Sequence, residues 1–296
     1  MSALVRPVRW IVPIAAAVLL PIAGLASAAS ATSAPSTGPT LVAPHLQSTD
    51  RHVGSVHIPH PRTTLAANQS NNWSGYNQGA LEQGNKQFTS IGGQWVVPTA
   101  SQHTKGQAED SASWIGIGGG CIDANCTVTD NTLIQTGTEQ DVAADGTTTY
   151  DAWFELIPAP ELIVTNVAIH PGDTVKASIS SPANGAWTIT LTDVTDGQGF
   201  TQTAPYSSSL ATAEWIEETP LEIGTDAGLA ALPNLGSVNF DLATTNGAPA
   251  GLKAAEEMQL VDSSNSVIMA PSSPDGDTDG FNDCSWASSC AAPGSS

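Results

Sequence analysis

Two neighbouring stretches decide the fold, "TVKASISS" at residues 174–181 and "GAWTITLTDVT" at residues 185–195. Both are rich in Val, Ile, Thr and Trp, which favour β-strands, and the Pro, Asn and Gly between them are typical of a turn. The same pattern recurs throughout residues 69–296, where the short run "GLKAAEEMQL" (251–260) is the one helix-like candidate. Many short strands without intervening helices predict one all-β domain, an antiparallel sandwich or barrel.

The N-terminus has the composition of a targeting segment. Residues 1–28 combine two arginines, an apolar run interrupted by two prolines, and a small-residue "ASA" end at 26–28. This is the order of a secretory signal peptide. A retained membrane anchor is the weaker alternative, because small residues and prolines make a poor spanning helix. The sequence therefore predicts a secreted, extracellular protein.

Residues 29–68 form a leader that differs from everything after it. They are rich in Ser, Thr and Pro, and they carry four of the six histidines together with Arg51 and Arg62. Such a composition cannot bury a core. We therefore expect a linker or a propeptide, and we expect the folded domain to comprise residues 69–296.

The chain is strongly acidic from residue 69 onward, with 27 Asp and Glu against four lysines and a formal charge of −23. This charge excludes nucleic acid and anionic membranes as partners. It favours an acidic working environment, because protonation of the carboxylates relieves their repulsion. A basic leader on an acidic body also predicts that the propeptide inhibits the protein near neutral pH and loosens in acid.

The four cysteines fall into two close pairs, Cys121/Cys126 and Cys284/Cys290. In an exported chain these pairs predict two local disulfides. Zinc is the weaker interpretation, because neither spacing fits a common ligand pattern and no histidine cluster accompanies the cysteines. We expect no metal and no cofactor.

Most catalytic motifs are missing from the body of the chain. Its histidines, His103 and His170, lie in no H-E-x-x-H zinc signature, and nothing supports a Ser/His/Asp site on either of them. The "GIGGG" run (116–120) lacks the helix and lysine of a phosphate-binding loop and is interpreted as a turn. The "DGDTDGFND" run (275–283) begins like a calcium loop, but it lacks the glutamate of loop position 12, so an ordinary Asp/Gly turn is the better interpretation.

Carboxylates remain as candidates, and the run "ATAEWIEETP" (211–220) holds three glutamates within five positions. Alternation places Glu214, Ile216 and Glu218 on one face of an extended strand and Glu217 on the other. A carboxylate on a partly apolar face is unusual, because desolvation disfavours its charged form. Alternation alone does not choose between Glu214 and Glu218.

Six blocks in a fixed order make the domain recognisable. They are "NNWSGY" (71–76), "FTSIGGQWVVP" (88–98), "SWIGIGG" (113–119), "LIQTGTEQ" (133–140), "YDAWFELIP" (150–158) and "AEWIEETP" (213–220). Together they resemble the glutamic peptidases, the eqolisin family, and especially its bacterial branch. The resemblance implies a lectin-like, jelly-roll sandwich of two curved antiparallel sheets. It also implies a secreted endopeptidase that is made with a propeptide, acts on polypeptides in acid, and uses a catalytic Gln/Glu pair without a metal.

The resemblance carries the catalytic pair onto Gln135, in the Q-T-G block, and Glu214, in the A-E-W block. Peptide hydrolysis needs a base for water, an acid for the leaving nitrogen and donors for the oxyanion. Glu214 suits the proton transfers, and Gln135 offers an amide that low pH leaves unchanged. A hydrogen bond from Gln135 is expected to help keep Glu214 ionised. Glu217 and Glu218 are then expected on the acidic surface, dispensable for activity.

Four further residues match positions near the family's cleft or supporting its site: Trp73, Trp114, Asp151 and Glu155. The tryptophans suit either substrate contact or the core, and several tryptophans of the chain are candidates for lining a groove. Alternation puts Asp151 and Glu155 on one face of a strand, where they are expected to support the site together. The block "GIGG" (116–119) departs from the fungal "GIDG", so fungal substrate preferences do not carry over.

The same sandwich suits two other functions. A lectin-like module would use exposed tryptophans to bind carbohydrate, and a glycosidase would use two carboxylates. The Gln/Glu pair favours the peptidase, because a glycosidase needs a second carboxylate opposite Glu214. We expect a monomer.

Overall fold

The computed structural model describes four stretches of the chain: 38–48, 68–181, 185–222 and 228–295. The expected signal peptide and the leader residues 29–37 and 49–67 lie outside the described residues. Within these stretches the protein is almost entirely β-structure, which confirms the expected fold class. No helix among the described residues is long and apolar enough to span a membrane.

The strands, in chain order, are β1 (Thr40–Val42), β2 (Leu46–Ser48), β3 (Gln69–Ser70), β4 (Trp73–Gly79), β5 (Ser90–Val96), β6 (Glu109–Gly118), β7 (Leu133–Val142), β8 (Thr148–Leu156), β9 (Leu162–Ala168), β10 (Thr174–Ser180), β11 (Ala186–Asp193), β12 (Gln198–Pro205), β13 (Thr212–Glu218), β14 (Leu221–Glu222), β15 (Gly228–Leu229), β16 (Ser237–Thr245), β17 (Ala248–Pro249), β18 (Glu257–Val261), β19 (Val267–Pro271) and β20 (Phe281–Ser285). The expected helix at 251–260 is a 3₁₀ turn, η1 (Ala254–Glu256), that leads directly into β18.

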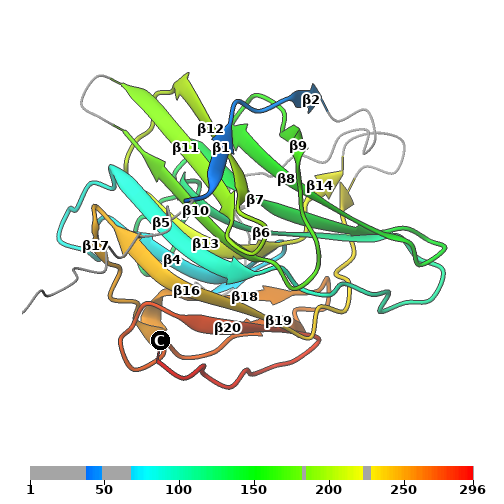
Figure 1. The fold of residues 1–296 in the computed structure, drawn as a ribbon. Helices are drawn as coiled ribbons and strands as arrows, with labels where there is room; N and C mark the ends of the chain where they lie inside the picture. The colour runs from blue at the N-terminus through cyan, green and yellow to red at the C-terminus, as the bar shows by residue number, and fades with distance from the viewer. Residues whose placement is uncertain (1–37, 49–67, 182–184, 223–227, 296) are drawn as a thin grey trace, which may run out of the picture. The chain divides into compact units, whose positions relative to one another are not determined.

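Backbone pairing arranges the strands in two layers that share β18 (Figure 1). The β5 layer runs β1, β12, β11, β10, β5, β16, β20, β19, β18, and the β13 layer runs β18, β4, β13, β6, β7, β8, β9, β2. One end of β18 pairs with β19 and the other end with β4, so the sheet passes from one layer to the other at this strand. The neighbours in these two orders are antiparallel except β1 and β12, and the short β3 adds a second parallel pairing, with β18. The result is the expected two-layer sandwich.

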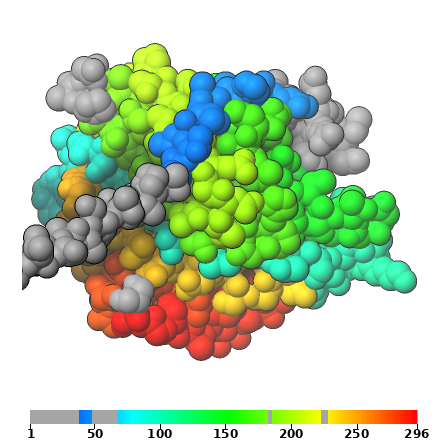
Figure 2. Space-filling model, viewed as in Figure 1, coloured from blue at the N-terminus to red at the C-terminus, as the bar shows by residue number. Residues whose placement is uncertain are grey.

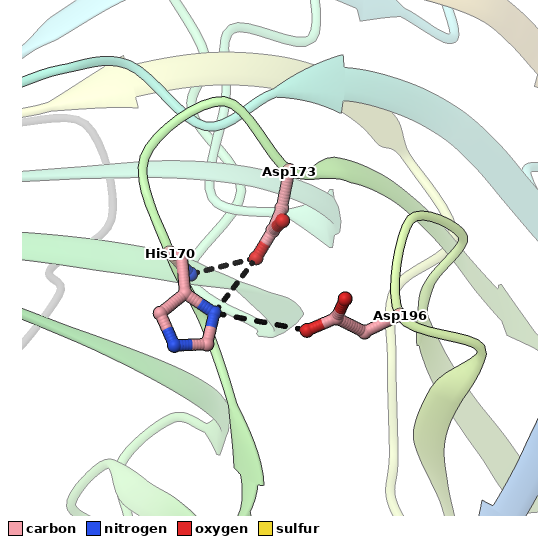
Figure 3. Close-up of side chains that lie close together, drawn as sticks. All are labelled: His170, Asp173 and Asp196. Carbon is pink, nitrogen blue, oxygen red and sulfur yellow. Dashed lines mark hydrogen bonds and ion pairs between the residues drawn. The ribbon is translucent and has the colours of Figure 1, made fainter.

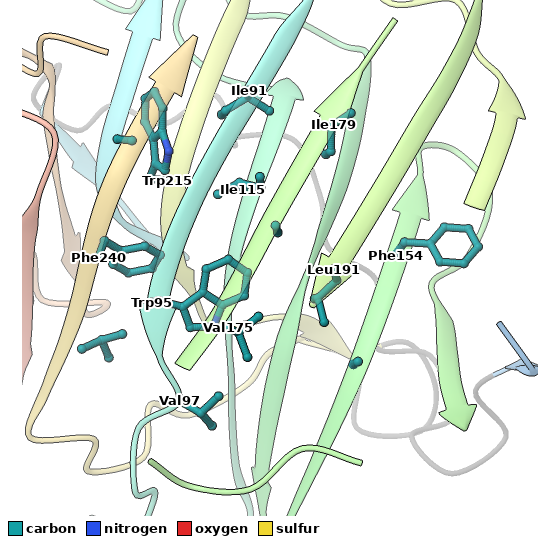
Figure 4. Packing of buried hydrophobic residues seen from close by; sticks show 14 of the residues in the cluster. Ile91, Trp95, Val97, Ile115, Phe154, Val175, Ile179, Leu191, Trp215 and Phe240 are labelled. Carbon is teal, nitrogen blue, oxygen red and sulfur yellow. The ribbon is translucent and has the colours of Figure 1, made fainter. Parts of the chain in front are cut away.

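The main core lies between the two layers, and Figure 4 shows part of it. Trp215 on β13 donates its indole N–H to the Gly92 carbonyl on β5, and Trp95 on β5 donates its own to the Thr138 hydroxyl on β7, both at 2.9 Å. Each indole thus buries a large apolar surface while its polar end finds a partner. These contacts hold β13 and β7 against β5.

The two layers differ in their outer faces. Strands β5 and β10 alternate between buried and more exposed positions, as expected for a sheet with one face in water. Strands β4, β6, β7 and β13 are buried at every position. Both faces of the β13 layer are therefore covered in its middle, and polar side chains on either face lie in dry surroundings.

Six of the seven tryptophans in the body are buried, which corrects the expectation that several line a groove. They are Trp73, Trp95, Trp114, Trp153, Trp187 and Trp215. Trp286 is 39% exposed and stacks on His103, with ring centroids 3.5 Å apart.

The leader contributes a strand to the free edge of each layer. β1 pairs with β12 in parallel and β2 pairs with β9 antiparallel. Figure 2 shows residues 38–48, in blue, lying along the surface against these strands. The body thus includes part of the segment that was expected to precede it.

Both disulfides are the local pairs expected from the sequence, Cys121–Cys126 and Cys284–Cys290.

Candidate active site

The outer face of the β13 layer carries a row of four polar side chains and one glycine, with one residue from each of five adjacent strands. The strand registers place them side by side in the order Asn77, Glu214, Gly116, Gln135 and Glu155. Neighbouring strands lie about 4.8 Å apart, so Glu214 and Gln135 are two strand spacings apart. The residue between them is a glycine. Position 116 itself therefore places no side chain between Glu214 and Gln135.

Gly116 has a second role, because it leaves room for Trp114. A Cβ at position 116 would lie 2.8 Å from Cζ3 of Trp114 and 3.0 Å from Cδ1 of Leu133. The edge of the Trp114 indole therefore lies directly over the glycine. The run 116–120 was expected to be a turn, but its first three residues belong to β6.

Gln135 is buried and its amide is held from one side. Its Nε2 donates to Glu155 Oε2 at 2.7 Å, and its Oε1 has no hydrogen-bond partner among the described residues. The expected hydrogen bond from Gln135 to Glu214 is therefore absent, because Glu155, the next residue in the row, takes the amide. Glu155 thus orients Gln135, as a residue that supports the site would.

Glu214 is fully enclosed, and neither of its carboxylate oxygens has a hydrogen-bond partner in the described part of the chain. Burial raises the pKa of Glu214 well above its ordinary value. The negative charge of Asp130 raises this pKa further, while the Thr212 hydroxyl and the Gly120 N–H approach the carboxylate and oppose the rise without making a hydrogen bond. In this arrangement Glu214 is protonated in acid. The expectation that Gln135 keeps it ionised is wrong here.

The segment around Gly120 covers Glu214. A Cβ at Gly120 would lie 2.5 Å from Glu214 Oε1 and would also strike the Asn77 side chain. Asn77 holds this segment in place, because its Oδ1 accepts from the Cys121 N–H at 3.0 Å and its Nδ2 donates to the Cys121 carbonyl at 2.9 Å. The Cys121–Cys126 disulfide loop is thus fixed beside the carboxylate.

Trp73 and Trp114 belong to a second apolar cluster, on the outer face of the β13 layer. The cluster also contains Trp153, Ile216 and Met258. The Trp73 and Trp114 rings meet edge to face, with centroids 5.1 Å apart. The sequence left substrate contact and core packing open for the two tryptophans, and this structure places both in the cluster.

Asp151 and Glu155 share a face of β8, as alternation predicts, but they lie in different rows. Glu155 pairs with Gln135, whereas Asp151 pairs with Glu139. Glu139 in turn lies across Ala112 from Glu218. Of the two acidic residues, Glu155 is the one that reaches the Gln135 row.

Glu217 and Glu218 are both fully buried, so their expected place on the acidic surface is wrong. Glu218 lies on the face of Glu214, whereas Glu217 points between the layers. There, Glu217 accepts hydrogen bonds from Ser113 Oγ at 2.5 Å and from Gln140 Nε2 at 2.9 Å. The physical reason is the position of β13 between β4 and β6, in the covered middle of its layer.

Two groups of side chains in the described residues have donor atoms close enough to hold a cation. Figure 3 shows the first, in which Nδ1 of His170 lies 3.4 Å from Asp173 and 3.8 Å from Asp196. The His170 side chain is 61% exposed, which suits a surface ion pair.

The second group is Asp241, Asp275 and Asp279. Asp275 Oδ1 accepts the backbone N–H groups of Asp279 and Gly280, both at 3.2 Å, which supports the interpretation of the run as an Asp/Gly turn, here over 275–280 and leading into β20. Asp277 is not part of the group, so the calcium-loop spacing is not reproduced.

Three residues around Glu214 were not found from the sequence: Gly116, Gly120 and Asp130. A glycine inside a strand is a signal of close approach, and Gly116 has that signal. Asp130 has no sequence signal that separates it from the other acidic residues, because its proximity to Glu214 depends on the fold.

Comparison with known proteins agrees with these observations. The model of the peptidase A4 family matches residues 71–279. Aspergillopepsin-2 of Aspergillus niger is 27% identical in an alignment of 216 residues that covers 64% of this chain and 70% of that protein. Scytalidopepsin B of Scytalidium lignicola is 28% identical over 122 residues, 41% of this chain and 42% of that protein.

A crystal structure of scytalido-glutamic peptidase with a transition state analog inhibitor has the same fold. It superposes with a TM-score of 0.55 and 22% identity, covering 73% of this chain and 98% of that one. The family match extends over most of the chain and includes every residue of the Glu214 row. The chain therefore belongs to the peptidase A4 family, the glutamic peptidases.

Proposed function

We propose that this glutamic peptidase is a secreted, acid-active endopeptidase in which Glu214 activates water and Gln135 stabilises the oxyanion. One observation carries the proposal: a carboxyl group and an amide, both buried, lie on the same face of the layer on either side of a glycine, with three of their four polar atoms unpartnered. Unpartnered polar groups in a dry site cost free energy. Such unpartnered groups are expected where a bound reactant forms hydrogen bonds with them.

The reaction needs one proton to be moved twice. Glu214 in its ionised form takes a proton from water, and the water oxygen attacks the carbonyl carbon of the peptide. The carbonyl oxygen becomes an oxyanion and accepts a hydrogen bond from Gln135 Nε2. Glu214 then gives the proton to the leaving nitrogen, the C–N bond breaks, and a carboxylic acid and an amine leave.

Glu155 determines which N–H of Gln135 is left for the oxyanion. A primary amide has two N–H donors, and Glu155 holds one of them at 2.7 Å. The second N–H and the carbonyl oxygen of Gln135 are then turned away from Glu155. We propose that this second N–H is the oxyanion donor.

The raised pKa of Glu214 describes the protein without substrate, in which the segment around Gly120 covers the carboxyl group. A water molecule and a bound peptide donate hydrogen bonds to the carboxylate, and such bonds favour its charged form. We propose that substrate binding lowers the pKa of Glu214 into the acid range, where the ionised form acts as the base.

The alternative functions have less support. A two-carboxylate glycosidase needs an acid opposite Glu214, and that position is held by Gln135, an amide. A lectin-like module needs exposed tryptophans, and among the tryptophans of the described residues Trp286 alone is exposed.

The decisive experiment measures cleavage of a denatured protein between about pH 2 and pH 5, below and around the ordinary pKa of a glutamate. Pepstatin is present to suppress contaminating aspartic peptidases. Wild type should cleave, Glu214→Gln should be inactive, and Gln135→Ala should lose roughly 10²–10³ in kcat, as oxyanion donors do. An inactive wild type, or a fully active Glu214→Gln variant, would overturn the mechanism.

We also propose that the leader is an inhibitory propeptide of a monomeric enzyme. Pairing of β1 and β2 with the body supports this, because it gives the leader an anchor on the domain. The purified precursor should be silent near neutral pH, and incubation near pH 3 should release the leader and activity. A precursor that is fully active before any cleavage would contradict the proposal.

A further inference from the structure

Glu218 lies on the same face of β13 as Glu214, with Ile216 between them. It is fully buried. Its Oε1 accepts a hydrogen bond from Asn72 Nδ2 at 3.0 Å, and its Oε2 accepts one from the Trp114 indole N–H at 2.9 Å.

Trp114 connects Glu218 to the gap between Glu214 and Gln135. The indole N–H end is fixed by Glu218, while the opposite edge of the ring lies over Gly116. Trp73 packs edge to face against the ring, the backbone of Gly137 lies against the Trp114 Cβ, and the hydrogen bond to Glu218 sets the remaining orientation of the indole. The indole therefore spans from Glu218 to the floor of the gap.

We infer that Glu218 is a positioning residue of the peptidase: through Trp114 it fixes the apolar floor between Glu214 and Gln135. The inference rests on the proposed function of that pair. It does not assign Glu218 any contact with substrate or any proton transfer. Without Glu218 the indole N–H loses its acceptor, and the far edge of the ring loses its fixed place over Gly116, between Glu214 and Gln135.

A displacement of about 1 Å in such a site is enough to lower the rate by about 10²-fold. We therefore expect Glu218→Ala to lower kcat by roughly that factor with little change in KM. Glu218→Gln keeps an oxygen for the Trp114 N–H and should recover most of the rate. This pattern separates the loss of an anchor from the loss of a charge.

Glu217→Gln is the matched control. Glu217 is the adjacent residue and equally buried, but it faces Ser113 and Gln140 on the other side of β13. Burial raises the pKa of Glu217 to about 7, so in acid it is already neutral and glutamine closely resembles it. This variant should keep the wild-type kcat in acid.

The Trp114 indole N–H provides a readout that does not depend on activity. Its NMR signal, assigned by its loss in Trp114→Phe, should shift in Glu218→Ala and stay in place in Glu217→Gln. Trp114→Phe breaks the same link from the other end. If Glu218→Ala does not fold, Trp114→Phe serves instead, because it removes the donor of the same hydrogen bond, and a wild-type kcat in Trp114→Phe would then overturn the inference.

The outcomes distinguish the two proposals. An inactive wild type overturns the proposed function. An active wild type in which Glu218→Ala has the kcat of Glu217→Gln, or an unshifted Trp114 signal in Glu218→Ala, overturns this inference alone. A shifted signal together with a lowered kcat and rescue by glutamine supports it.

Discussion

Replacing Glu217 by glutamine should reduce the loss of folding stability that wild type undergoes between acidic and neutral pH. Glu217 is buried between the layers, where Ser113 and Gln140 donate hydrogen bonds to it. The charges near it are also acidic: Glu218 is its chain neighbour, and Asp283 reaches across from β20, its Oδ1 accepting from Ser74 Oγ at 2.7 Å. An ionised Glu217 would therefore face desolvation and repulsion together.

The magnitude follows from the pKa. Burial raises the pKa of Glu217 from 4.5 to about 7. Between these values the unfolded chain is ionised at this residue while the folded chain keeps its proton, so the free energy of unfolding falls by about 1.4 kcal/mol for each pH unit. Over about 2.5 pH units the loss is about 3 kcal/mol. The stabilisation is complete below about pH 4.5 and is gone above about pH 7.

The Glu217→Gln variant lacks this titration. It should match wild type near pH 4 and be more stable by about 3 kcal/mol near pH 7. For a domain of this size that is roughly 6–12 °C in Tm. Burial also raises the pKa of Asp283, so part of the pH dependence of wild type remains in the variant.

The assay is urea unfolding followed by tryptophan fluorescence at both pH values. The Glu214→Gln background prevents self-digestion, and the exposed Glu82→Gln is the control for loss of one acidic residue. If the Glu217→Gln variant loses as much stability as wild type between pH 4 and pH 7, the reasoning about its burial is refuted.

Three further predictions concern the surroundings of Glu214 and the leader. Asp130→Asn removes a charge that raises the pKa of Glu214, so the acidic limb of the pH profile of kcat/KM should move to lower pH. An acidic limb at the wild-type position would count against Glu214 as the base. Gly120→Ala brings a Cβ to 2.5 Å from Glu214 Oε1 and should lower kcat/KM by about tenfold or more, measured with a peptide substrate; an unchanged value would contradict the tight cover. Deleting residues 38–48 leaves the edges of β12 and β9 unpaired and should increase aggregation, measured by light scattering. A variant as monodisperse as wild type would show that these edges need no cover.

The sequence predicted the faces of β13 but not their burial. Glu214 and Glu218 share one face and Glu217 points to the other, as alternation requires. The sequence placed Glu217 and Glu218 on the surface, because a glutamate without a known role is normally solvated. Their burial depends on β4 and β6 flanking β13 and on what covers each face, and these are long-range properties that a strand's own residues do not encode.

The pair Gln135 and Glu214 could be picked out from the block pattern, but the row around them could not. Gly116 lies between them because of two strand registers, β13 with β6 and β6 with β7. The hydrogen bond between Gln135 and Glu155 depends on a third, β7 with β8. Registers are set by how whole strands pack, so the sequence suggested a Gln135–Glu214 contact where the structure has Gln135–Glu155.

The two faces of β13 together link the working pH of the site to the stability of the fold. Glu214 on the outer face has a pKa raised by burial, and so does Glu217 on the inner face. Glu217 is neutral in acid and loses its proton as the pH rises through about 7, and burial likewise raises the pKa of Asp283. Ionisation of Glu217 therefore destabilises the fold as the pH rises towards neutral, while the overall acidic charge repels least in acid. The inner face of β13 thus favours the same acidic conditions as the chemistry proposed for its outer face.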